Sequence, residues 1–482
     1  MHKFTMPADR WDELNPDKQA ILHLIQKHQQ CVPKLNKLKA YYEGKHDILK
    51  DSARENRLVC NHAKDITDTA SSYFIGEPIT YKSDLDIKPL TDAFETAGCD
   101  EADGDNGLDL SIYGRAYEYI YTKEDEAELT VKNIPLQATF MVYDDTIEEN
   151  ELFAVYYYPR RDDTDRTSTV YIATVLTKNY KYVLNIQNID TPQALIEPPE
   201  PHYKGEVPVV EYLNNKLAIG DFELQIPLID AYNALMSDRV TDKEQFIDAI
   251  LAIYGTLLSD EDSEPGDGEG AEKAMKRLRR EKLLEMPGDG AKAEYITRTY
   301  DESGVEILKK ALEQDIHKFS HIPCMTDESF GGNVSGVAME FKLLGMENIT
   351  KIKTRYYKKG LRKRIKIFTN FLSTGARANI DPDAVIPIFS RALPKNLLET
   401  SQIVNNLWGK VSRKTLLAQV PFVTNVDEEL KAVEEEEQAA LEQQRELFGN
   451  EPNTPPDNEE QQQEEKKTGR KEETGGVADG KE

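Results

Sequence analysis

The residues SGVAMEFKLLGMENITKIKTRYYKKGLRKRIKIFTNF (335–371) decide how the middle of this chain folds. They follow a glycine-rich segment, Phe330–Gly336, and predict one long helix from about Ser335 to Phe371, with Ser335 as its N-cap. The second half of this helix, Lys351 to Lys366, carries nine Lys or Arg side chains and no acid. Such crowding destabilises a helix through repulsion between neighbouring turns, unless carboxylates from elsewhere balance it.

Two interpretations of this basic helix remain open. Its cations either pair with carboxylates of this acidic protein, on other segments or on other subunits, or contact phosphate groups directly. The residues concerned are Lys351, Lys353, Arg355, Lys358, Lys359, Arg362, Lys363, Arg364 and Lys366.

Upstream, the sequence predicts two helices flanking an insertion. Val305, Leu308, Leu312, Ile316 and Phe319 step along one helix, and residues 227–254 form another, with Pro227 in its first turn and a polar stretch from Ser237 to Gln245. Between them lie an acidic, glycine-rich loop (259–270), a short basic helix (271–282) and a strand-like pair (282–285 and 293–297). We therefore expect a helical hairpin whose ends lie close together.

The spacing of apolar residues changes along the first 215 residues. Helical spacing predicts helices at 15–30, after Pro33 and from about Asn61 to Tyr73. From about 110 to 215, alternation and turn clusters predict a mostly antiparallel β domain, with strands at 139–143, 154–158, 170–175 and 180–186. Beyond the long helix we expect a strand at 385–389 and helices at 400–408, 412–417 and 427–447.

Composition excludes several classes of protein. The chain of 482 residues has 60 basic and 87 acidic side chains, a net charge of −27, which argues against general DNA gripping because such proteins neutralise phosphates with Lys and Arg. No apolar run approaches the roughly 18 to 20 residues that span a bilayer, and residues 1–10 lack the apolar core of a secretory signal. Four cysteines without CxxC spacing indicate a reducing cytosol.

Motifs for catalysis or metal binding are weak. There is no HExxH, Walker A loop or GxSxG elbow, and Ser335 in Gly332–Gly336 is better explained as a helix cap than as a nucleophile. His317 and His321 could share a metal, but a solvated helix face explains them as well. The acids Asp260, Asp262 and Glu264 lack the glycine of a calcium loop and favour a soluble loop, and the run 100–107 is interpreted in the same way. We expect no cofactor and no metal.

Several segments, taken in order, resemble the portal proteins of long-tailed, double-stranded DNA bacteriophages of Gram-positive hosts. The segments are Tyr41–Gly44, Asn61 with Tyr73–Ile79, Tyr113–Tyr117, Gly205–Glu211, Leu228–Asn233 with Ser237-Asp238, Phe330–Ala338 and Lys359–Leu361. The resemblance covers roughly residues 35 to 440. No single motif is diagnostic, but so many in the same order are specific.

The resemblance implies an α+β subunit with an α/β wing, a two-helix stem, a small α/β clip and a helical crown, assembling into a ring of about twelve copies. The corresponding regions are an N-terminal extension (1–34), the wing (35–236), stem helices (237–254 and 303–324), the clip (255–302), a tunnel loop (325–336), the long wing helix with its returning strand (337–394), the crown (395–447) and a disordered acidic tail (448–482).

The resemblance also implies partners. The ring would lie at one capsid vertex of the virion after assembly in the host cytoplasm, dock the terminase large subunit for packaging, and later seat the head-tail connector for genome retention and ejection. Scaffolding and major capsid proteins would surround it, no membrane would be involved, and double-stranded DNA would pass without sequence specificity. The residues that would face DNA in the tunnel loop are Gly331, Gly332, Asn333, Val334, Ser335 and Gly336.

A second basic cluster lies in the region assigned to the clip. We expect it to contact acidic surfaces of a partner protein or of neighbouring subunits, through Lys273, Lys276, Arg277, Arg279, Arg280 and Lys282. Elsewhere, an acidic or neutral channel lining would repel the DNA backbone and let it slide. The alternatives to a structural portal protein without catalysis are a metal-dependent nuclease or hydrolase with a split acidic site, and a monomeric adaptor protein.

Overall fold

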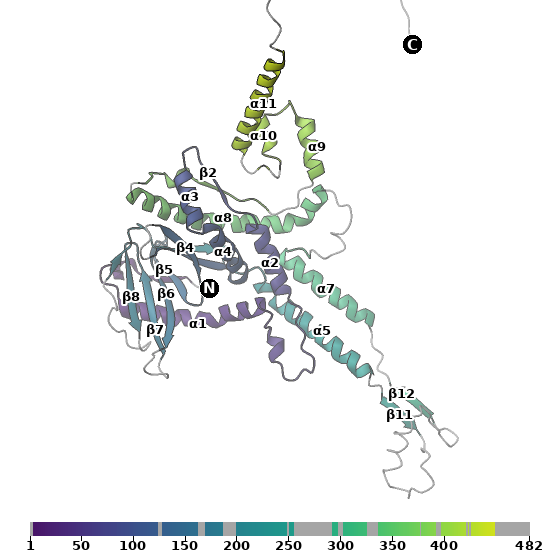
Figure 1. Ribbon diagram of the computed structural model, residues 1–482. Helices are drawn as coiled ribbons and strands as arrows, with labels where there is room; N and C mark the ends of the chain where they lie inside the picture. Colours follow the sequence, from purple (N-terminus) through teal and green to yellow (C-terminus); the bar gives the residue numbers. More distant parts are fainter. Residues whose placement is uncertain are drawn as a thin grey trace, which may run out of the picture. The chain divides into compact units, whose positions relative to one another are not determined.

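The computed structural model describes residues 3–123, 128–161, 169–186, 199–247, 250–254, 292–296, 302–324, 336–375, 377–391, 397–420, 423 and 426–448. The chain divides into two compact units, residues 1–394 and 395–482, and each is considered by itself (Figure 1). No helix among these residues is both long and apolar enough to cross a membrane.

The chain begins with a short strand and a long helix. Strand β1 (Phe4–Met6) precedes α1 (Lys18–Tyr42), whose N-cap Asp17 accepts hydrogen bonds from the backbone N–H groups of Gln19 and Ala20 at 3.0 and 3.2 Å. The prediction that Pro33 starts a second helix is wrong, since α1 runs through it. Buried residues on both sides of Pro33 hold one continuous helix, although an internal proline costs about 3 kcal/mol.

Two sheets form the β region, and they confirm the predicted, mostly antiparallel β domain. One has the order β1-β5-β6-β7-β8-β9, in which only β1 pairs in parallel, with β5; the other has the order β10-β3-β4. The strands are β3 (Arg115–Thr122), β4 (Leu129–Ile134), β5 (Thr139–Asp144), β6 (Glu151–Arg161), β7 (Thr169–Leu176), β8 (Tyr180–Ile186), β9 (Glu200–Pro201) and β10 (Val209–Leu213).

Three helices lie near the three-stranded sheet. They are α2 (His62–Ile75), as predicted, α3 (Lys88–Thr96) and α4 (Cys99–Tyr113). Helices α3 and α4 pack on the sheet, and α2 packs on α4. Helix α4 corrects the interpretation of residues 100–107 as a soluble loop. Asp103 and Asn106 face inward there and are buried, because they hydrogen bond to side chains of α8 and β3.

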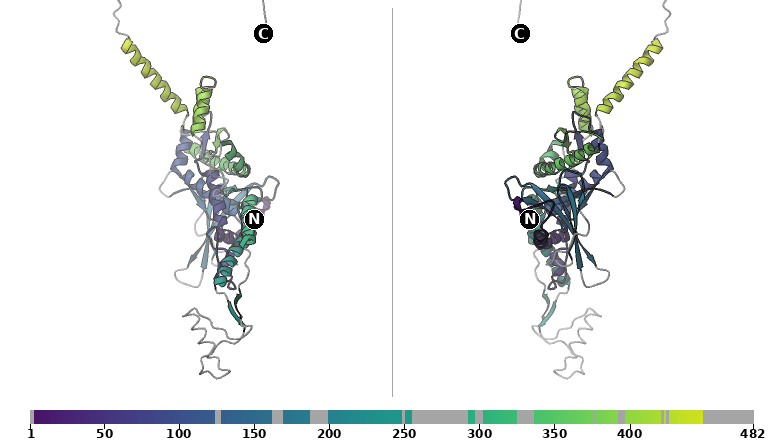
Figure 2. Two further views of the ribbon diagram at one scale, coloured as in Figure 1. Left: turned by 90° about the vertical axis from the view of Figure 1, so that its right-hand side faces the viewer. Right: turned by 90° about the vertical axis from the view of Figure 1, so that its left-hand side faces the viewer.

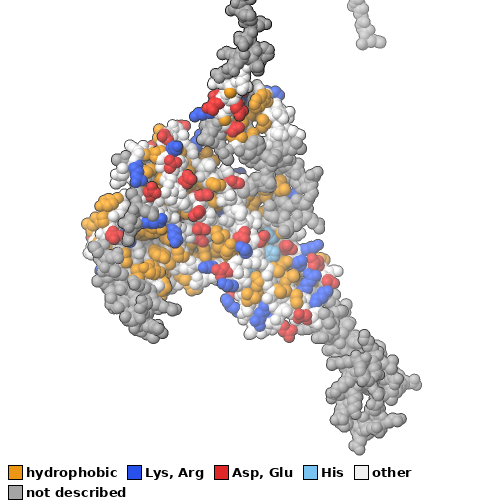
Figure 3. All heavy atoms as spheres, viewed as in Figure 1, with side chains coloured by type: hydrophobic (Ala, Val, Ile, Leu, Met, Phe, Trp, Pro, Cys, Tyr) orange, Lys and Arg blue, Asp and Glu red, His pale blue; other side chains and the backbone are white. Residues whose placement is uncertain are grey.

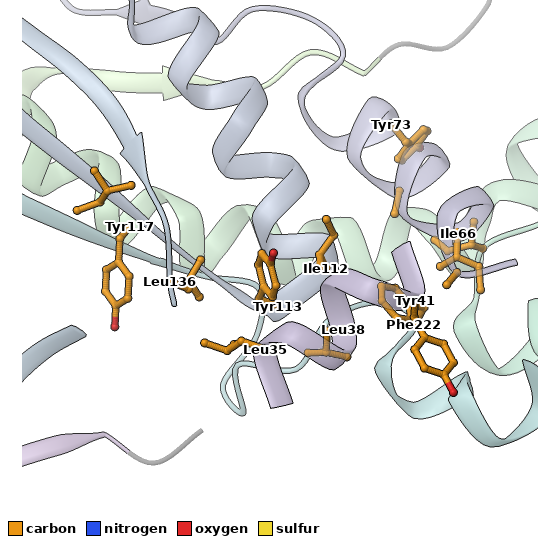
Figure 4. Close-up of a cluster of buried hydrophobic side chains, with 14 of the residues drawn as sticks. Leu35, Leu38, Tyr41, Ile66, Tyr73, Ile112, Tyr113, Tyr117, Leu136 and Phe222 are labelled. Atoms are coloured by element: carbon orange, nitrogen blue, oxygen red, sulfur yellow. The ribbon is translucent and has the colours of Figure 1, made fainter. Parts of the chain in front are cut away.

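Three clusters of buried apolar side chains join these elements. The first half of α1 covers the six-stranded sheet through Ile21, Leu24 and Ile25, next to Phe140 and Phe153. A second cluster joins the rest of α1 to α2, α4 and both sheets, and Figure 4 shows some of its side chains. A third lies between α3, α4 and the second half of the long helix α8.

The predicted helical hairpin is present, with one correction. Helices α5 (Ile226–Ile247) and α7 (Glu302–Ser320) lie side by side, and strands β11 (Ile250–Tyr254) and β12 (Lys292–Ile296) pair antiparallel at their far end (Figures 1 and 2). We expected the helix to reach residue 254. Residues 250–254 instead form β11, because Ile250 and Ile253 favour a strand once β12 is available as a partner. The second predicted strand therefore exists, but it pairs with β11.

Helix α8 (Gly336–Thr374) confirms the long helix predicted from 335–371. Strand β13 (Ile386–Ile388), also predicted, pairs antiparallel with β2 (Thr80–Lys82). Short 3-10 helices occur at Ala8–Arg10, Asp47–Lys50, Glu223–Gln225 and Pro382–Ala384.

The second unit contains the helices expected near the C-terminus. They are α9 (Leu397–Leu407), α10 (Arg413–Leu417) and α11 (Val426–Phe448). Ser412 caps α10, and Arg413 forms an ion pair with Glu437 of α11 at 2.7 Å.

Candidate functional site

The base of the α5–α7 hairpin is where several of the segments quoted for the resemblance meet. The hydroxyl of Tyr41 donates to Asp230 Oδ1 at 2.8 Å, and the Asn233 side chain accepts from the Cys60 N–H at 2.8 Å. The hydroxyl of Ser237 accepts from the backbone N–H of Leu58 at 2.9 Å. These bonds fix the start of α5 to the end of α1 and to the segment before α2.

Farther along, the two helices of the hairpin are joined by charges. Arg239 of α5 pairs with Glu306 of α7 at 2.9 Å, and Lys243 pairs with Glu302 at 3.0 Å. Exposed pairs of this kind contribute little individually, typically about 0–1 kcal/mol. They set the register between the helices more than they stabilise the hairpin.

The apolar stripe predicted on α7 is divided between two environments. Ile316 is fully buried at the base, but Leu308 and Phe319 are 49% and 56% exposed; Ile307, which lies outside the predicted stripe, is 69% exposed. Figure 3 shows apolar side chains among charged ones on the visible face of the hairpin. Large exposed apolar groups gathered on one element mark a surface that another protein covers.

Helix α8 is anchored by a buried cluster of charges. The Arg364 guanidinium, fully buried, donates to both oxygens of Asp103 at 2.6 and 3.0 Å and to Glu118 at 2.8 Å. Tyr357 donates to the same Asp103, and Tyr212 to Glu118. Burial, together with these carboxylates, raises the pKa of both phenols well above the usual range, so they stay protonated donors. The cluster ties α8 to α4, β3 and β10.

Other cations of the basic run also pair with this chain's own carboxylates. Lys353 is buried against Asp221 at 2.7 Å. Further ion pairs join Lys363 to Glu151, Lys366 to Glu206, and Lys351 to Glu347, while Lys358 lies over the Phe389 ring. Internal pairing thus accounts for much of the basic run.

Three exposed cations of the run are not paired in this way. Arg355, Lys359 and Arg362 are exposed and make no ion pair or hydrogen bond to any residue in the described ranges. Their spacing places them on one face of α8, in line with Phe341, Leu344 and Ile352 nearer its start, which are 73%, 50% and 45% exposed. The solvent face of α8 is therefore apolar toward its N-terminus and basic toward its C-terminus.

Two of the predicted sites lie outside the residues that the structure describes. They are the basic cluster Lys273–Lys282 and the tunnel loop apart from Gly336, which is the first residue of α8; the Ser335 cap is among the residues that are not described. The acids Asp260, Asp262 and Glu264 also fall there. For these residues the sequence-based expectations stand as predictions.

The expectation that His317 and His321 lie on a solvated helix face is wrong, since His317 is buried and His321 follows the end of α7. His317 Nδ1 lies 3.0 Å from the carbonyl of Ile322, and the ring of His317 packs edge-on against His62. Across the described ranges, no three His, Cys, Asp or Glu side chains come together as metal ligands. Burial lowers the pKa of His62, which favours its neutral form.

Sequence reasoning missed the carboxylates that bind the basic helix. Asp103, Glu118 and Asp221 are far from α8 along the chain. One signal existed: Asp103 and Asn106 are three apart, on one face of what proves to be a helix. A second buried pair, Arg115 with Glu211 at 3.0 Å, joins two of the segments quoted for the resemblance.

Comparisons with known proteins agree with this picture. The model of the family described as phage portal protein, SPP1 Gp6-like, matches residues 21–458. The portal protein of Bacillus phage SPP1 is 24% identical over 423 residues, covering 83% of this chain and 80% of that protein. The portal protein of Clostridium phage phiCD119 is 22% identical over 429 residues, covering 82% of this chain and 90% of that protein.

Solved structures also resemble the chain. They include the neck of a native gene transfer agent particle computed with C12 symmetry, which covers 75% of this chain and 91% of its own at 10% identity and a TM-score of 0.42. A chain from the virion of a native gene transfer agent particle covers 74% of this chain and 89% of its own, at 10% identity and a TM-score of 0.42. Portal proteins are structural components of the virion at the capsid vertex. Because the family model spans most of the sequence, the chain belongs to the SPP1 Gp6-like family of phage portal proteins.

Proposed function

We propose that this protein closes into a ring of about twelve copies that forms the DNA channel of one capsid vertex. The family match over residues 21–458 carries this proposal. Within it, α5 from Ser237 onward and α7 correspond to the stem, and α8 belongs to the wing. Strand β12 lies within the clip (255–302) and pairs with β11 directly before it, and residues 395–447 of the second unit correspond to the crown. The helical part of the first stem segment ends at Ile247.

The exposed apolar groups support a ring. Ile307, Leu308 and Phe319 on α7 and Phe341 and Leu344 on α8 are apolar groups that a single chain leaves in water. In a ring, each subunit presents one surface to the next and receives another, so every copy covers such groups on its neighbour. Burial of apolar area contributes roughly 25 cal/mol per Å², so covering these residues would favour assembly.

Charge supports passage of DNA without tight binding. The net charge of −27 repels the DNA backbone, and the internal pairing of Lys353, Lys363, Arg364 and Lys366 makes these four cations of α8 less available to phosphate. Each phosphate contact that is avoided lowers the barrier to sliding. In this proposal the loop 325–336 faces the duplex, and no residue performs catalysis.

The partners follow from the same proposal. The terminase large subunit and later the head-tail connector dock on the clip, where Lys273, Lys276, Arg277, Arg279, Arg280 and Lys282 would meet acidic surfaces; scaffolding and major capsid proteins surround the wing. Reversing the charges of Lys276, Arg279 and Arg280 should abolish packaging or connector docking while rings still form. Normal packaging by that variant would contradict this assignment of the clip.

Negative-stain imaging and light scattering of the purified chain test the ring. We expect annular particles with a central hole and a mass of about 660 kDa for twelve copies of the 54.8 kDa chain. Leu308→Glu with Phe319→Glu should reduce ring formation strongly, whereas Ile147→Glu, at a fully exposed position, should not. A 54.8 kDa particle under all ionic conditions would favour the adaptor, and cleavage of DNA with magnesium would favour the nuclease.

A further inference from the structure

A large groove lies apart from the α5–α7 hairpin, between the two sheets. Its volume is about 1140 Å³, and it is lined by β3 and β4 on one side, by β6 to β9 on the other and by the C-terminal end of α8. Several of these elements can be followed in Figure 1. Pockets for small molecules usually measure about 300–1,000 Å³, so this groove is also large enough for part of a peptide.

A largely buried lysine side chain lines the groove. Lys204 is only 5% exposed, yet its Nζ makes no ion pair or hydrogen bond to any described residue. Its backbone is fixed on both sides, since its N–H donates to His202 Nδ1 at 3.3 Å and its carbonyl accepts from Asn370 Nδ2 at 3.2 Å. Burial, with a contribution from Lys181, lowers the pKa of Lys204 to about 8. A largely buried charge without a protein partner is costly, so an anion in the groove would gain from contact with Lys204.

The charge of the lining agrees with an anionic ligand. Lys123, Lys132, Lys181, Lys204 and Arg377 line the groove, against a single carboxylate among its lining residues, Glu200. That carboxylate already pairs with Lys181 at 3.2 Å. Among the described lining residues, basic side chains therefore outnumber acidic ones in a chain whose net charge is −27.

The walls of the groove are aromatic. The rings of Tyr119 and Tyr121 stack with their centroids 5.1 Å apart, and Tyr156 and Phe371 line the groove as well. Aromatic side chains offer rigid contact area for apolar groups, and tyrosine and arginine are enriched where proteins bind proteins. The ligand therefore carries apolar as well as anionic groups.

We propose that this groove binds an acidic peptide segment of a partner protein. Its carboxylates would meet Lys204 and Lys132, and its apolar side chains would pack on Tyr119 and Tyr121. A peptide fits better than a nucleic acid, because a long polyphosphate must also run over a protein surface that is acidic overall, whereas a short segment touches only the groove. The proposal does not depend on ring formation.

Fluorescence anisotropy with the full chain tests the proposal. The probe is a fluorescein-labelled peptide of roughly ten residues, rich in glutamate and leucine, and the matched control peptide has glutamine in place of glutamate. We expect binding of the glutamate peptide to weaken with salt and to fall about tenfold or more in Lys204→Met. Lys216→Met, exposed and outside the groove, should leave binding unchanged.

Stability and competition complete the test. Lys204→Met removes an unpaired buried charge, so its melting temperature should not fall, which separates lost binding from lost folding. Equal binding of the glutamine peptide, or unchanged binding by Lys204→Met, overturns the proposal. It is also overturned if a single-stranded oligonucleotide of equal charge binds more tightly than the peptide, or if inorganic phosphate at millimolar concentration displaces the peptide completely.

Discussion

Replacing Arg364 by methionine is the sharpest test of how α8 is held. The guanidinium is fully buried and is the shared partner of Asp103 and Glu118. Methionine has a similar length and keeps the apolar contacts of the aliphatic part of the arginine side chain, but it leaves two buried carboxylates facing each other. Breaking a buried ion pair in this way costs about 3–5 kcal/mol, because the remaining charge keeps its desolvation penalty.

The matched control is Arg362→Met. Arg362 lies two residues earlier on the same helix, is exposed and has no ion pair within the described ranges, so this change should stay within about 0.5 kcal/mol. Urea unfolding followed by tryptophan fluorescence and circular dichroism gives both values. A third variant, which adds Asp103→Asn and Glu118→Gln to Arg364→Met, should recover part of the loss because no charge then stays buried.

The reasoning would be refuted if Arg364→Met and Arg362→Met unfolded at the same urea concentration. It would also fail if the triple variant were less stable than Arg364→Met alone, since the loss would then come from packing and not from charge. Arg364→Lys is informative too: lysine keeps the charge but cannot bridge two carboxylates with a planar fork, so an intermediate loss is expected.

Three further predictions concern packing and pH. Gly360→Ala should destabilise the protein by roughly 1–3 kcal/mol, because a Cβ there would lie 2.4 Å from the Tyr212 ring. The control Gly345→Ala, whose Cβ would have its nearest neighbour at 3.7 Å, should be neutral or stabilising. Equal melting temperatures of the two variants would contradict this prediction. Burial raises the pKa of Asp109 to about 7, so its contribution to stability is present below pH 4 and lost as pH rises through 7. Asp109→Asn should therefore raise the melting temperature at pH 8 but not at pH 4, and an equal effect at both would be evidence against it. Burial lowers the pKa of His28 to about 4, so its contribution is present above pH 6.5 and lost toward pH 4. His28→Phe should flatten the fall of melting temperature over that range, and an unchanged slope would show that this histidine is not its cause.

The long elements could be predicted from sequence because their periodicity is local. Helix α8, the α5–α7 hairpin and the strands between 139 and 186 follow from spacing alone. Elements whose form depends on distant partners could not be predicted. Strand β1 has only three residues and exists because β5 offers an edge, and residues 250–254 become a strand because β12 pairs with them.

The same limit applies to the candidate site. The cations of α8 are visible in the sequence, but their partners Asp103, Glu118 and Asp221 come from other elements. The spacing of Asp103 and Asn106, three apart, was the one local signal that part of an acidic stretch folds inward. At Pro33 the prediction failed in the opposite way, because the sequence indicated a helix break that the structure does not have. A strong local signal for a break was overridden, because residues on both sides of it are buried by the rest of the chain.

Helix α8 is anchored unevenly along its length. Lys353 and Arg364 hold its second half through buried ion pairs, and in its first half Leu343 and Met346 are buried while Phe341 and Leu344 are exposed. At 1.5 Å per residue, the stretch from Gly336 to the first of these buried residues, Leu343, is about 10 Å long. We therefore expect amide hydrogen exchange in α8 to be fastest before Leu343 and to slow from there toward Arg364.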